Sequence, residues 1–267
     1  MSRIIVITSG KGGVGKTTIT ANLGVSLAQL GRKVALVDAD FGLRNLDLLL
    51  GLENRVVYTA AEVIAGECPI EKALVKDKRQ RGLVLLPAAQ NRNKDAFKPE
   101  QMKELVSKLA QNYDYVLIDS PAGIEMGFRN AISAATEALI VSTPEIASVR
   151  DADRVVGLLE AEKIQKIRLI VNRLRPEMVQ LEKMLSVEDI LDLLVVPLIG
   201  VIPDDERVIV STNRGEPLVL DERRPSLPAI AFKNLSRRLE GEEEVPFLDL
   251  LAAHDNLLTR IRRLFQS

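Results

Sequence analysis

A glycine-rich stretch near the N-terminus, residues 10–17 (GKGGVGKT), constrains the fold most. It lies between an apolar β-branched run, residues 4–8, and a segment with leucines at helical spacing, residues 18–30. Glycines let backbone N–H groups turn inward around phosphate oxygens, and a helix N-terminus adds a favourable dipole. The stretch fits the P-loop pattern residue for residue in the strand–loop–helix context that the pattern requires. The sequence therefore predicts a phosphate site here rather than a glycine-rich turn without a ligand.

Short apolar runs alternate with helical patterns along the rest of the chain. This alternation predicts an α/β fold with a single doubly wound, mostly parallel sheet of about seven strands and helices on both faces. The expected strands are residues 4–8, 33–38, 83–86, 115–118, 138–142, 168–171 and 198–202. The expected helices are residues 18–30, 100–112, 148–163, 188–194 and 227–239. We expect one ATPase domain over 1–239, an acidic and polar connector over 240–255, and an amphipathic tip over 256–267.

The residue types inside the loop indicate what the site does. Lys16 would place a positive charge on the β and γ phosphates, and the Thr17 hydroxyl would ligate Mg²⁺ directly. We therefore expect ATP and Mg²⁺ as the cofactors. The residues expected to surround the nucleotide phosphates are Gly10, Lys11, Gly12, Gly13, Val14, Gly15, Lys16, Thr17 and Thr18.

Composition excludes several other chemistries. Cys68 is the single cysteine, which excludes an intrachain disulfide and an all-cysteine metal or iron–sulfur site within one chain. A net charge of −1, few aromatic residues and no Trp provide neither a basic field nor a stacking platform, so no specific nucleic acid is expected as a partner. No apolar run reaches the roughly 18 residues of a membrane span, and no targeting segment precedes the first strand. These observations predict a cytoplasmic protein.

The loop has a second lysine, Lys11, and KGGVGKT resembles the signature of the deviant Walker A ATPases, the ParA/MinD family. Longer stretches, including DADFGLRNLDLLLGL, DSPAGIEMG and GVIPDDERV, resemble the MinD branch of that family. The resemblance covers residues 3 to about 220 and the C-terminal tip. It implies a homodimerising, membrane-cycling ATP hydrolase that works slowly as a switch. Such an enzyme positions the cell-division site by recruiting a division inhibitor to the membrane.

The same resemblance implies catalytic and metal roles. In the family, the residue that corresponds to Lys11 crosses a dimer interface to the partner's phosphates, and Asp40 corresponds to the carboxylate that orients the attacking water. Lys11, Lys16 and Asp40 are therefore the expected catalytic residues. Asp38 and Asp119, each at the end of an apolar strand, would bind Mg²⁺ through water.

Further contacts of the nucleotide also follow from the resemblance. Asn45 would lie near the phosphates or the dimer interface, and a backbone N–H of Gly123 would sense the γ-phosphate. The base would be contacted from the ends of two strands, although an ordinary strand-end loop is an alternative for these positions. The candidate base contacts are Asn172, Pro203, Asp204 and Asp205.

The helix expected from residue 148 provides a candidate partner surface. Its valines can face the core, which leaves four charged side chains facing outward. The resemblance implies that this face binds an inhibitor of the MinC kind and an activator of the MinE kind, whereas a purely solvated face is the alternative. The four residues are Arg150, Asp151, Asp153 and Arg154.

The C-terminal tip has an amphipathic pattern. On a helix, Leu257, Leu258, Ile261, Leu264 and Phe265 fall within an arc of about 120°. Arg260 and Arg262 flank that arc, and Arg263 lies opposite. An apolar face edged by arginines is typical of a helix in an anionic lipid interface, whereas docking on the protein's own core is the alternative. The pattern predicts a peripheral membrane contact, and the family resemblance implies the inner face of the cell membrane, in a bacterium or for a protein encoded in a plastid.

Three other functions are compatible with the P-loop. A ParA-type DNA-partitioning ATPase would need a basic DNA-binding face and no amphipathic tip. A flagellar-number regulator would share the tip but usually carries an extra N-terminal segment. A non-hydrolysing scaffold would not require Lys16, Thr17, Asp40 and Asp119 together.

Overall fold

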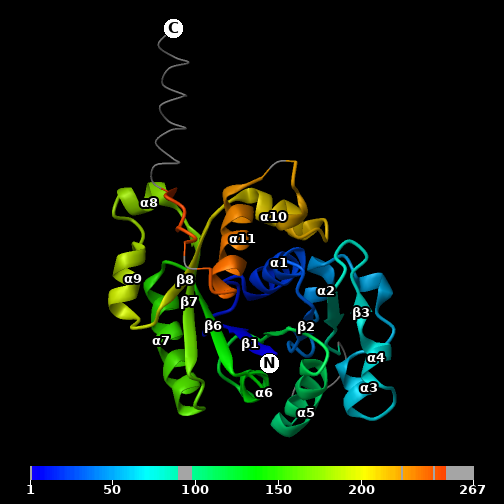
Figure 1. Ribbon diagram of the computed structural model, residues 1–267. Coiled ribbons are helices and arrows are strands. Elements are labelled where there is room, and N and C mark those ends of the chain that lie inside the picture. The colour runs from blue at the N-terminus through cyan, green and yellow to red at the C-terminus, as the bar shows by residue number, and fades with distance from the viewer. Residues whose placement is uncertain (1, 90–97, 224, 243, 251–267) are drawn as a thin grey trace.

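The computed structural model describes residues 2–89, 98–223, 225–242 and 244–250 of the 267-residue chain. Its eight-stranded sheet has the order β3-β4-β2-β5-β1-β6-β7-β8 (Figure 1). β3 pairs antiparallel with β4, and the other described pairs are parallel. The strands are β1 (Arg3–Thr8), β2 (Val34–Asp38), β3 (Val75–Lys76), β4 (Leu83–Leu86), β5 (Tyr115–Asp119), β6 (Glu137–Ser142), β7 (Lys166–Leu174) and β8 (Leu198–Pro203).

The predicted doubly wound, mostly parallel fold is confirmed, and the five predicted helices are present with ends displaced by two residues or fewer. The expected number of strands was wrong by one, because β3 is a two-residue edge strand and is too short to show a pattern. The helices are α1 (Lys16–Gln29), α2 (Leu46–Leu49), α3 (Ala60–Ile64), α4 (Ile70–Ala73), α5 (Pro99–Ala110), α6 (Met126–Ser133), α7 (Ile146–Ala161), α8 (Pro176–Gln180), α9 (Val187–Leu193), α10 (Glu206–Asn213) and α11 (Leu227–Leu239), with 3₁₀ turns η1 (Glu53–Arg55) and η3 (Leu218–Leu220).

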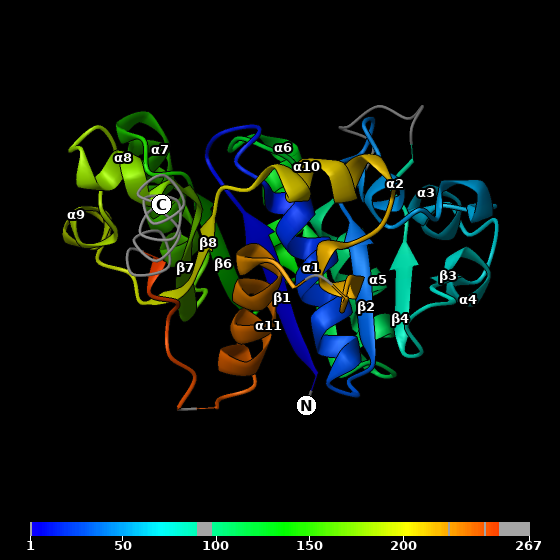
Figure 2. The ribbon, with the colours of Figure 1, turned by 90° about the horizontal axis from the view of Figure 1, so that it is seen from above.

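The helices form two layers around the sheet. α1 and α11 cover one face, and α5, α6 and α7 cover the other (Figures 1 and 2). Every residue of β2 and β5 is buried, as expected for parallel strands covered on both sides. α1 approaches β2 closely because Gly24 lacks a side chain, since an added Cβ would lie 2.6 Å from Leu36 Cδ2. Helix α1 is thereby packed closely against the central strands beneath the P-loop.

The beginning of the domain and its last long helix meet at one end of the sheet. Arg3 forms an ion pair with Glu137 and donates a hydrogen bond to the carbonyl of Leu239. Glu240, the first residue of the predicted connector, accepts a hydrogen bond of 2.8 Å from Arg32. Further along, Val245 and Leu250 are buried. Val245 and Leu250 thus attach the connector to the domain, although most of its other described residues are exposed.

Candidate functional site

The P-loop joins β1 to α1 at the carboxyl edge of the sheet. Gly13 and Gly15 adopt positive φ angles of 75° and 103°, the left-handed region that glycine tolerates best. Lys16 begins α1, and its Nζ donates a 3.0 Å hydrogen bond to Ser9 Oγ. The ammonium is buried, and this burial lowers the pKa of Lys16 against the opposing charges of Asp119 and Asp40. The loop thus holds a buried cation among glycines.

Two buried carboxylates lie beside this cation. Asp38 and Asp119 end the adjacent strands β2 and β5 and are directly paired in register. Burial raises the pKa of Asp119 to about 6, against a hydrogen bond from Thr17, the charge of Lys16 and a hydrogen bond from Thr20. Burial and the charge of Asp119 together raise the pKa of Asp38 well above its ordinary value.

This pair of carboxylates fits a divalent cation. Two adjacent buried acids resist ionisation in each other's presence, and a bound cation would relieve both the repulsion and the burial. Carboxylate and hydroxyl oxygens are the donors that Mg²⁺ prefers. Thr17, Asp38 and Asp119 are therefore the residues that would hold Mg²⁺, either directly or through water.

Asp38 also orders the loop that follows β2. Its carboxylate accepts hydrogen bonds from the backbone N–H groups of Asp40 at 3.0 Å and Leu46 at 3.3 Å. Residues 39–45 are therefore held at both ends by one side chain. Asn45 is exposed and is the N-cap residue of α2, without a side-chain capping hydrogen bond. Asp40 and Asn45 thus lie on a loop anchored at the predicted metal position.

Lys11 has a partner within its own chain. Its Nζ lies 2.9 Å from Glu145 Oε2, and both side chains are about half exposed. The hydrogen bond from Lys11 is the main cause of the lowered pKa of Glu145. Glu145 was not among the predicted site residues, although it directly precedes the helix that carries the predicted partner face. Ser9 and Thr20 were also missed. The sequence signal for Ser9 was its position directly before Gly10, and that for Thr20 was its position one helical turn after Lys16.

The predicted base contacts lie as follows. β7 extends to Leu174, so the expectation that Asn172 follows the strand was wrong. Asn172 is buried within β7 and donates from Nδ2 to the Val14 carbonyl at 2.7 Å, which places its amide against the P-loop. Pro203 is the last residue of β8.

Both acidic residues after β8 have partners. Asp204 forms an ion pair with Arg175 at 2.5 Å. Asp205 caps α10 and accepts a 2.8 Å hydrogen bond from the backbone N–H of Arg207. Their carboxylates are engaged by the protein, so contacts to a base from this loop would come most easily from its backbone.

The remaining predicted contacts lie in the turn before α6 and on α7. Gly123 has a φ of 87° in the turn between β5 and α6, and an added Cβ would meet no described atom within 4 Å. On α7, Arg150, Asp153 and Arg154 are exposed, whereas Asp151 is half-buried. The exposed three line a cavity of about 330 Å³, together with Ile146, Val149 and Leu193.

The predicted membrane tip lies outside the described residues. None of the helices that the structure describes has the length and hydropathy of a membrane span. The tip residues that lie outside are Leu257, Leu258, Arg260, Ile261, Arg262, Arg263, Leu264 and Phe265.

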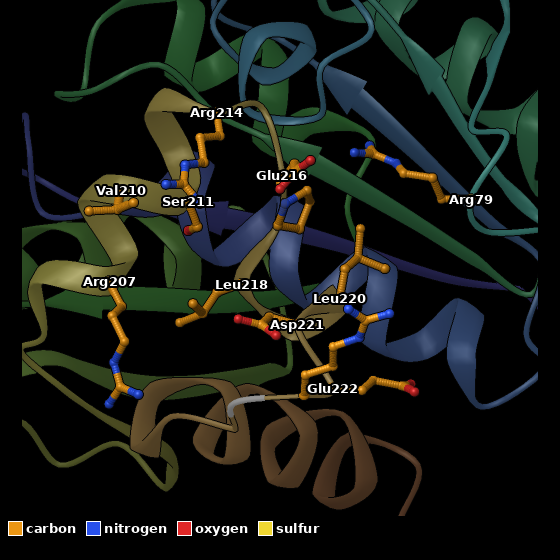
Figure 3. Close-up of a pocket in the computed structure, with 12 residues that line it drawn as sticks. Arg79, Arg207, Val210, Ser211, Arg214, Glu216, Leu218, Leu220, Asp221 and Glu222 are labelled. Atoms are coloured by element: carbon orange, nitrogen blue, oxygen red, sulfur yellow. The ribbon is translucent and has the colours of Figure 1, made fainter.

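A cavity of about 710 Å³ lies between α10, η3 and the segment before α11 (Figure 3). It contains none of the predicted phosphate residues. The charged residues among its described lining are Arg79, Arg207, Arg214 and Arg223 with Glu216, Asp221 and Glu222. Because arginines and carboxylates are intermixed, the cavity has no strong preference for an anion, and we place the nucleotide at the P-loop instead.

Comparison with curated proteins identifies close relatives. The chain is 70% identical over 263 residues to the septum site-determining protein MinD of Synechocystis sp., with 98% of each chain covered. It is 66% identical over 265 residues to a putative septum site-determining protein MinD of Guillardia theta, covering 99% of this chain and 98% of the relative.

Solved structures agree with this assignment. The fold matches MinD in the MinC:MinD cell division protein complex of Aquifex aeolicus with a TM-score of 0.84 and 54% identity, covering 91% of this chain and 97% of that one. It matches Pyrococcus horikoshii MinD complexed with Mg-ADP with a TM-score of 0.81 and 36% identity, covering 90% and 96%. A family model described as the CobQ/CobB/MinD/ParA nucleotide binding domain matches residues 5–218. The chain therefore belongs to the MinD/ParA family of P-loop nucleotide-binding proteins and, within it, to the septum site-determining MinD proteins, which place the site of cell division.

Proposed function

We propose that this chain is a slow ATP hydrolase whose nucleotide state controls dimerisation and membrane binding during placement of the division site. The observation that carries the proposal is the register of Asp38 with Asp119 beside the buried Lys16. This arrangement gathers a cation for the phosphates and two acids for a metal at one edge of the sheet. The Mg-ADP complex of the Pyrococcus horikoshii relative supports the same pairing of nucleotide and metal.

The reaction would be the attack of water on the γ-phosphorus. A bond forms between the water oxygen and that phosphorus as the bond from the phosphorus to the β–γ bridging oxygen breaks, giving ADP and phosphate. Asp40 would orient the water, and Lys16 would hold the β- and γ-phosphates. Mg²⁺, when bound, neutralises charge on the phosphate oxygens. Because the work is mostly positioning, turnover would be slow until a partner completes the site.

We propose that Lys11 serves a second subunit. Its ion pair with Glu145 joins two side chains that are about half exposed. Exposed pairs of this kind contribute roughly 0–1 kcal/mol, so the lysine can leave Glu145 at small cost. When two subunits face each other across bound ATP, Lys11 would contact the partner's phosphates. An ATP-dependent homodimer would result.

Membrane binding would follow from dimerisation. Each deeply inserted large apolar residue contributes roughly 1.5–3 kcal/mol, whereas ordering the backbone costs about 1–2 kcal/mol per residue. One amphipathic tip over 256–267 is therefore marginal, and two tips on one dimer gain from effective concentration. The protein would thus cycle between the cytoplasm and the inner face of the membrane. This division of labour implies an ATPase domain over 1–239, a connector over 240–255 and the tip.

Partners would use the exposed face of α7. Arg150, Asp153 and Arg154 are exposed there beside a cavity, which supports this face as a docking surface. The MinC:MinD complex of Aquifex aeolicus supports an inhibitor of the MinC kind as one partner. We propose an activator of the MinE kind as the other.

Sedimentation with anionic liposomes tests the proposal. We expect the full chain to pellet with ATP and Mg²⁺ but not with ADP, and Lys16→Ala to remain in the supernatant with either nucleotide. Lys33→Ala is the matched control, because Lys33 is an exposed lysine that precedes β2 at the opposite end of the sheet. Absence of pelleting by the full chain with ATP would refute the nucleotide-gated membrane switch.

A truncation isolates the contribution of the tip. A chain that ends before Leu257 should hydrolyse ATP at the basal rate of the full chain but fail to pellet. Pelleting at the level of the full chain would show that another surface binds lipid.

A further inference from the structure

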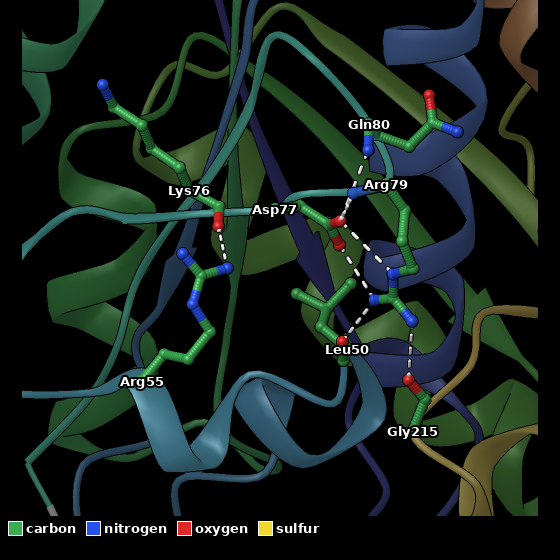
Figure 4. A network of polar contacts seen from close by, with 7 residues as sticks. All are labelled: Leu50, Arg55, Lys76, Asp77, Arg79, Gln80 and Gly215. Carbon is green, nitrogen blue, oxygen red and sulfur yellow. Dashed lines mark hydrogen bonds and ion pairs between the residues drawn. The ribbon is translucent and has the colours of Figure 1, made fainter.

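We propose that Arg79 is a positioning residue that ties the end of α2, the helix after the loop carrying Asp40, to the segment after α10 and so sets the rate of ATP hydrolysis. Figure 4 shows its contacts with Leu50 and Gly215. The inference rests on the proposed ATPase function. Arg79 follows β3 on the edge of the sheet, outside the P-loop and the loops that follow β2 and β5. Its influence on the reaction would therefore be indirect.

A buried carboxylate fixes the orientation of Arg79. Asp77 has a fully buried side chain, and its Oδ2 lies 2.9 Å from Arg79 Nη2. Asp77 Oδ1 accepts from Arg79 Nε at 3.3 Å and from the backbone N–H groups of Arg79 at 2.6 Å and Gln80 at 3.3 Å. The guanidinium is held as a planar fork, so its remaining N–H groups point in defined directions.

Those N–H groups bind two carbonyls from distant segments. Nη2 donates to the carbonyl of Leu50, the C-cap residue of α2, and Nη1 donates to the carbonyl of Gly215 at 3.1 Å. The two segments also touch directly, because an added Cβ on Gly51 would lie 2.7 Å from the Gly215 carbonyl oxygen. Arg79 therefore holds together two backbone segments that approach so closely that only glycine fits at positions 51 and 215.

Each locked segment leads back to the nucleotide site. α2 begins at Leu46, whose N–H binds the Asp38 carboxylate, so the loop with Asp40 lies between Asp38 and α2. α10 begins directly after Asp205 on the candidate base side and ends just before Gly215. Helices α2 and α10 thus begin beside the nucleotide site, and Arg79 joins the segments at their C-terminal ends.

The hydrogen bonds of Arg79 favour a structural role over the binding of a ligand in the adjacent cavity. Arg79 lines the cavity beside α10, but its guanidinium is already engaged by Asp77, Leu50 and Gly215. An anion would have to displace these partners and leave the buried Asp77 without its cation. The contacts favour a clamp over a binding site.

The expected effect is on the chemical step. Loss of the clamp would let α2 shift, and a displacement of the order of 1 Å at a positioning group can reduce a rate by about 10²-fold. The P-loop binds phosphate through its own backbone and Lys16, and neither contacts Arg79. Arg79→Lys should therefore lower kcat with little change in ATP affinity, because an ammonium cannot reproduce the fork.

The test compares Arg79→Lys with Arg55→Lys in the full chain. Arg55 donates to the carbonyl of Lys76, the last residue of β3, and within the described residues its side chain makes no hydrogen bond to Leu50 or Gly215. For Arg79→Lys we expect kcat to fall by about 10- to 100-fold, the Kd for ATP to stay within about twofold, and amide exchange to quicken in both 46–51 and 207–215. Arg55→Lys should match the wild type in all three.

A second variant keeps the arginine and breaks the contact. Gly215→Ala would place a Cβ 2.8 Å from Gly51 Cα and should give the same fall in kcat at constant Kd. Wild-type kcat in Arg79→Lys, or equal losses in kcat and ATP affinity, would overturn the inference. A wild-type chain that does not hydrolyse ATP would instead refute the proposed function.

Discussion

Replacing Asp119 by asparagine should stabilise the nucleotide-free protein while impairing its activity. Burial raises the pKa of Asp119 from 3.8 to about 6 in the folded state. A difference of about 2 pKa units, at about 1.4 kcal/mol each, makes the ionised carboxylate about 3 kcal/mol unfavourable for folding. Asparagine keeps the shape and removes the charge. Its extra N–H donors cost about 1 kcal/mol when poorly satisfied, which leaves a net gain of about 2 kcal/mol.

The effect of Asp119→Asn on the free energy of unfolding depends on pH. Because the folded pKa of Asp119 exceeds the unfolded value of 3.8, the folded protein binds this proton more tightly. The penalty is absent below pH 3.8, grows as the pH rises to about 6, and is complete above that pH. The gain from Asp119→Asn should therefore be present at pH 7.5, whereas near pH 4 mainly the cost of the poorly satisfied amide, about 1 kcal/mol, should remain. At neutral pH the gain corresponds to roughly 4–8 °C in Tm for a domain of this size.

Urea unfolding in EDTA at both pH values measures the effect. Glu137→Gln is the matched control: burial alone would raise the pKa of Glu137, but the hydrogen bond and charge of Arg3 lower it overall. The same amide replacement should therefore destabilise the protein at pH 7.5. The reasoning fails if Asp119→Asn is no more stable than the wild type at pH 7.5, or if its gain is the same at both pH values.

Three further outcomes follow from single contacts. Lys11→Ala removes only an exposed ion pair, so the free energy of unfolding in urea should change by less than about 1 kcal/mol; a larger loss would make that pair structural. Leu36→Ala leaves a void in the fully buried core and should cost about 2–5 kcal/mol in the same assay. Arg238→Ala removes hydrogen bonds to the Val245 and Pro246 carbonyls, so limited proteolysis should cut within 245–250 faster, and unchanged cleavage would contradict this contact.

The long elements could be predicted from the sequence because their patterns are continuous. The strands β1, β2 and β5 contain continuous apolar runs, and every residue of β2 and β5 and the last four residues of β1 are buried. α11 has the predicted bounds, since Ser226 caps its first turn and Pro228 lies within it. The P-loop needed no tertiary information, because the glycines and Lys16 are consecutive in the chain.

The helices of four or five residues, α2, α3, α4 and α8, could not be predicted. α2 has four residues, too few to show a period, and its position depends on the hydrogen bond between Leu46 and Asp38. The clamp at Arg79 joins residues more than a hundred positions apart, which no local pattern records. The ion pair between Lys11 and Glu145 likewise depends on tertiary structure, because β6 places the start of α7 next to the P-loop.

The position of β1 in the sheet has a consequence for synthesis. β1 is made first, yet its two neighbours are β5, which begins at Tyr115, and β6, which begins at Glu137. A nascent chain shorter than about 115 residues carries the central strand with both edges unpaired, a state prone to aggregation. The phosphate loop can be held in place only after the ribosome has released β6. Ribosome-bound chains should therefore bind nucleotide late, and a holding chaperone would find its substrate in the first half of translation.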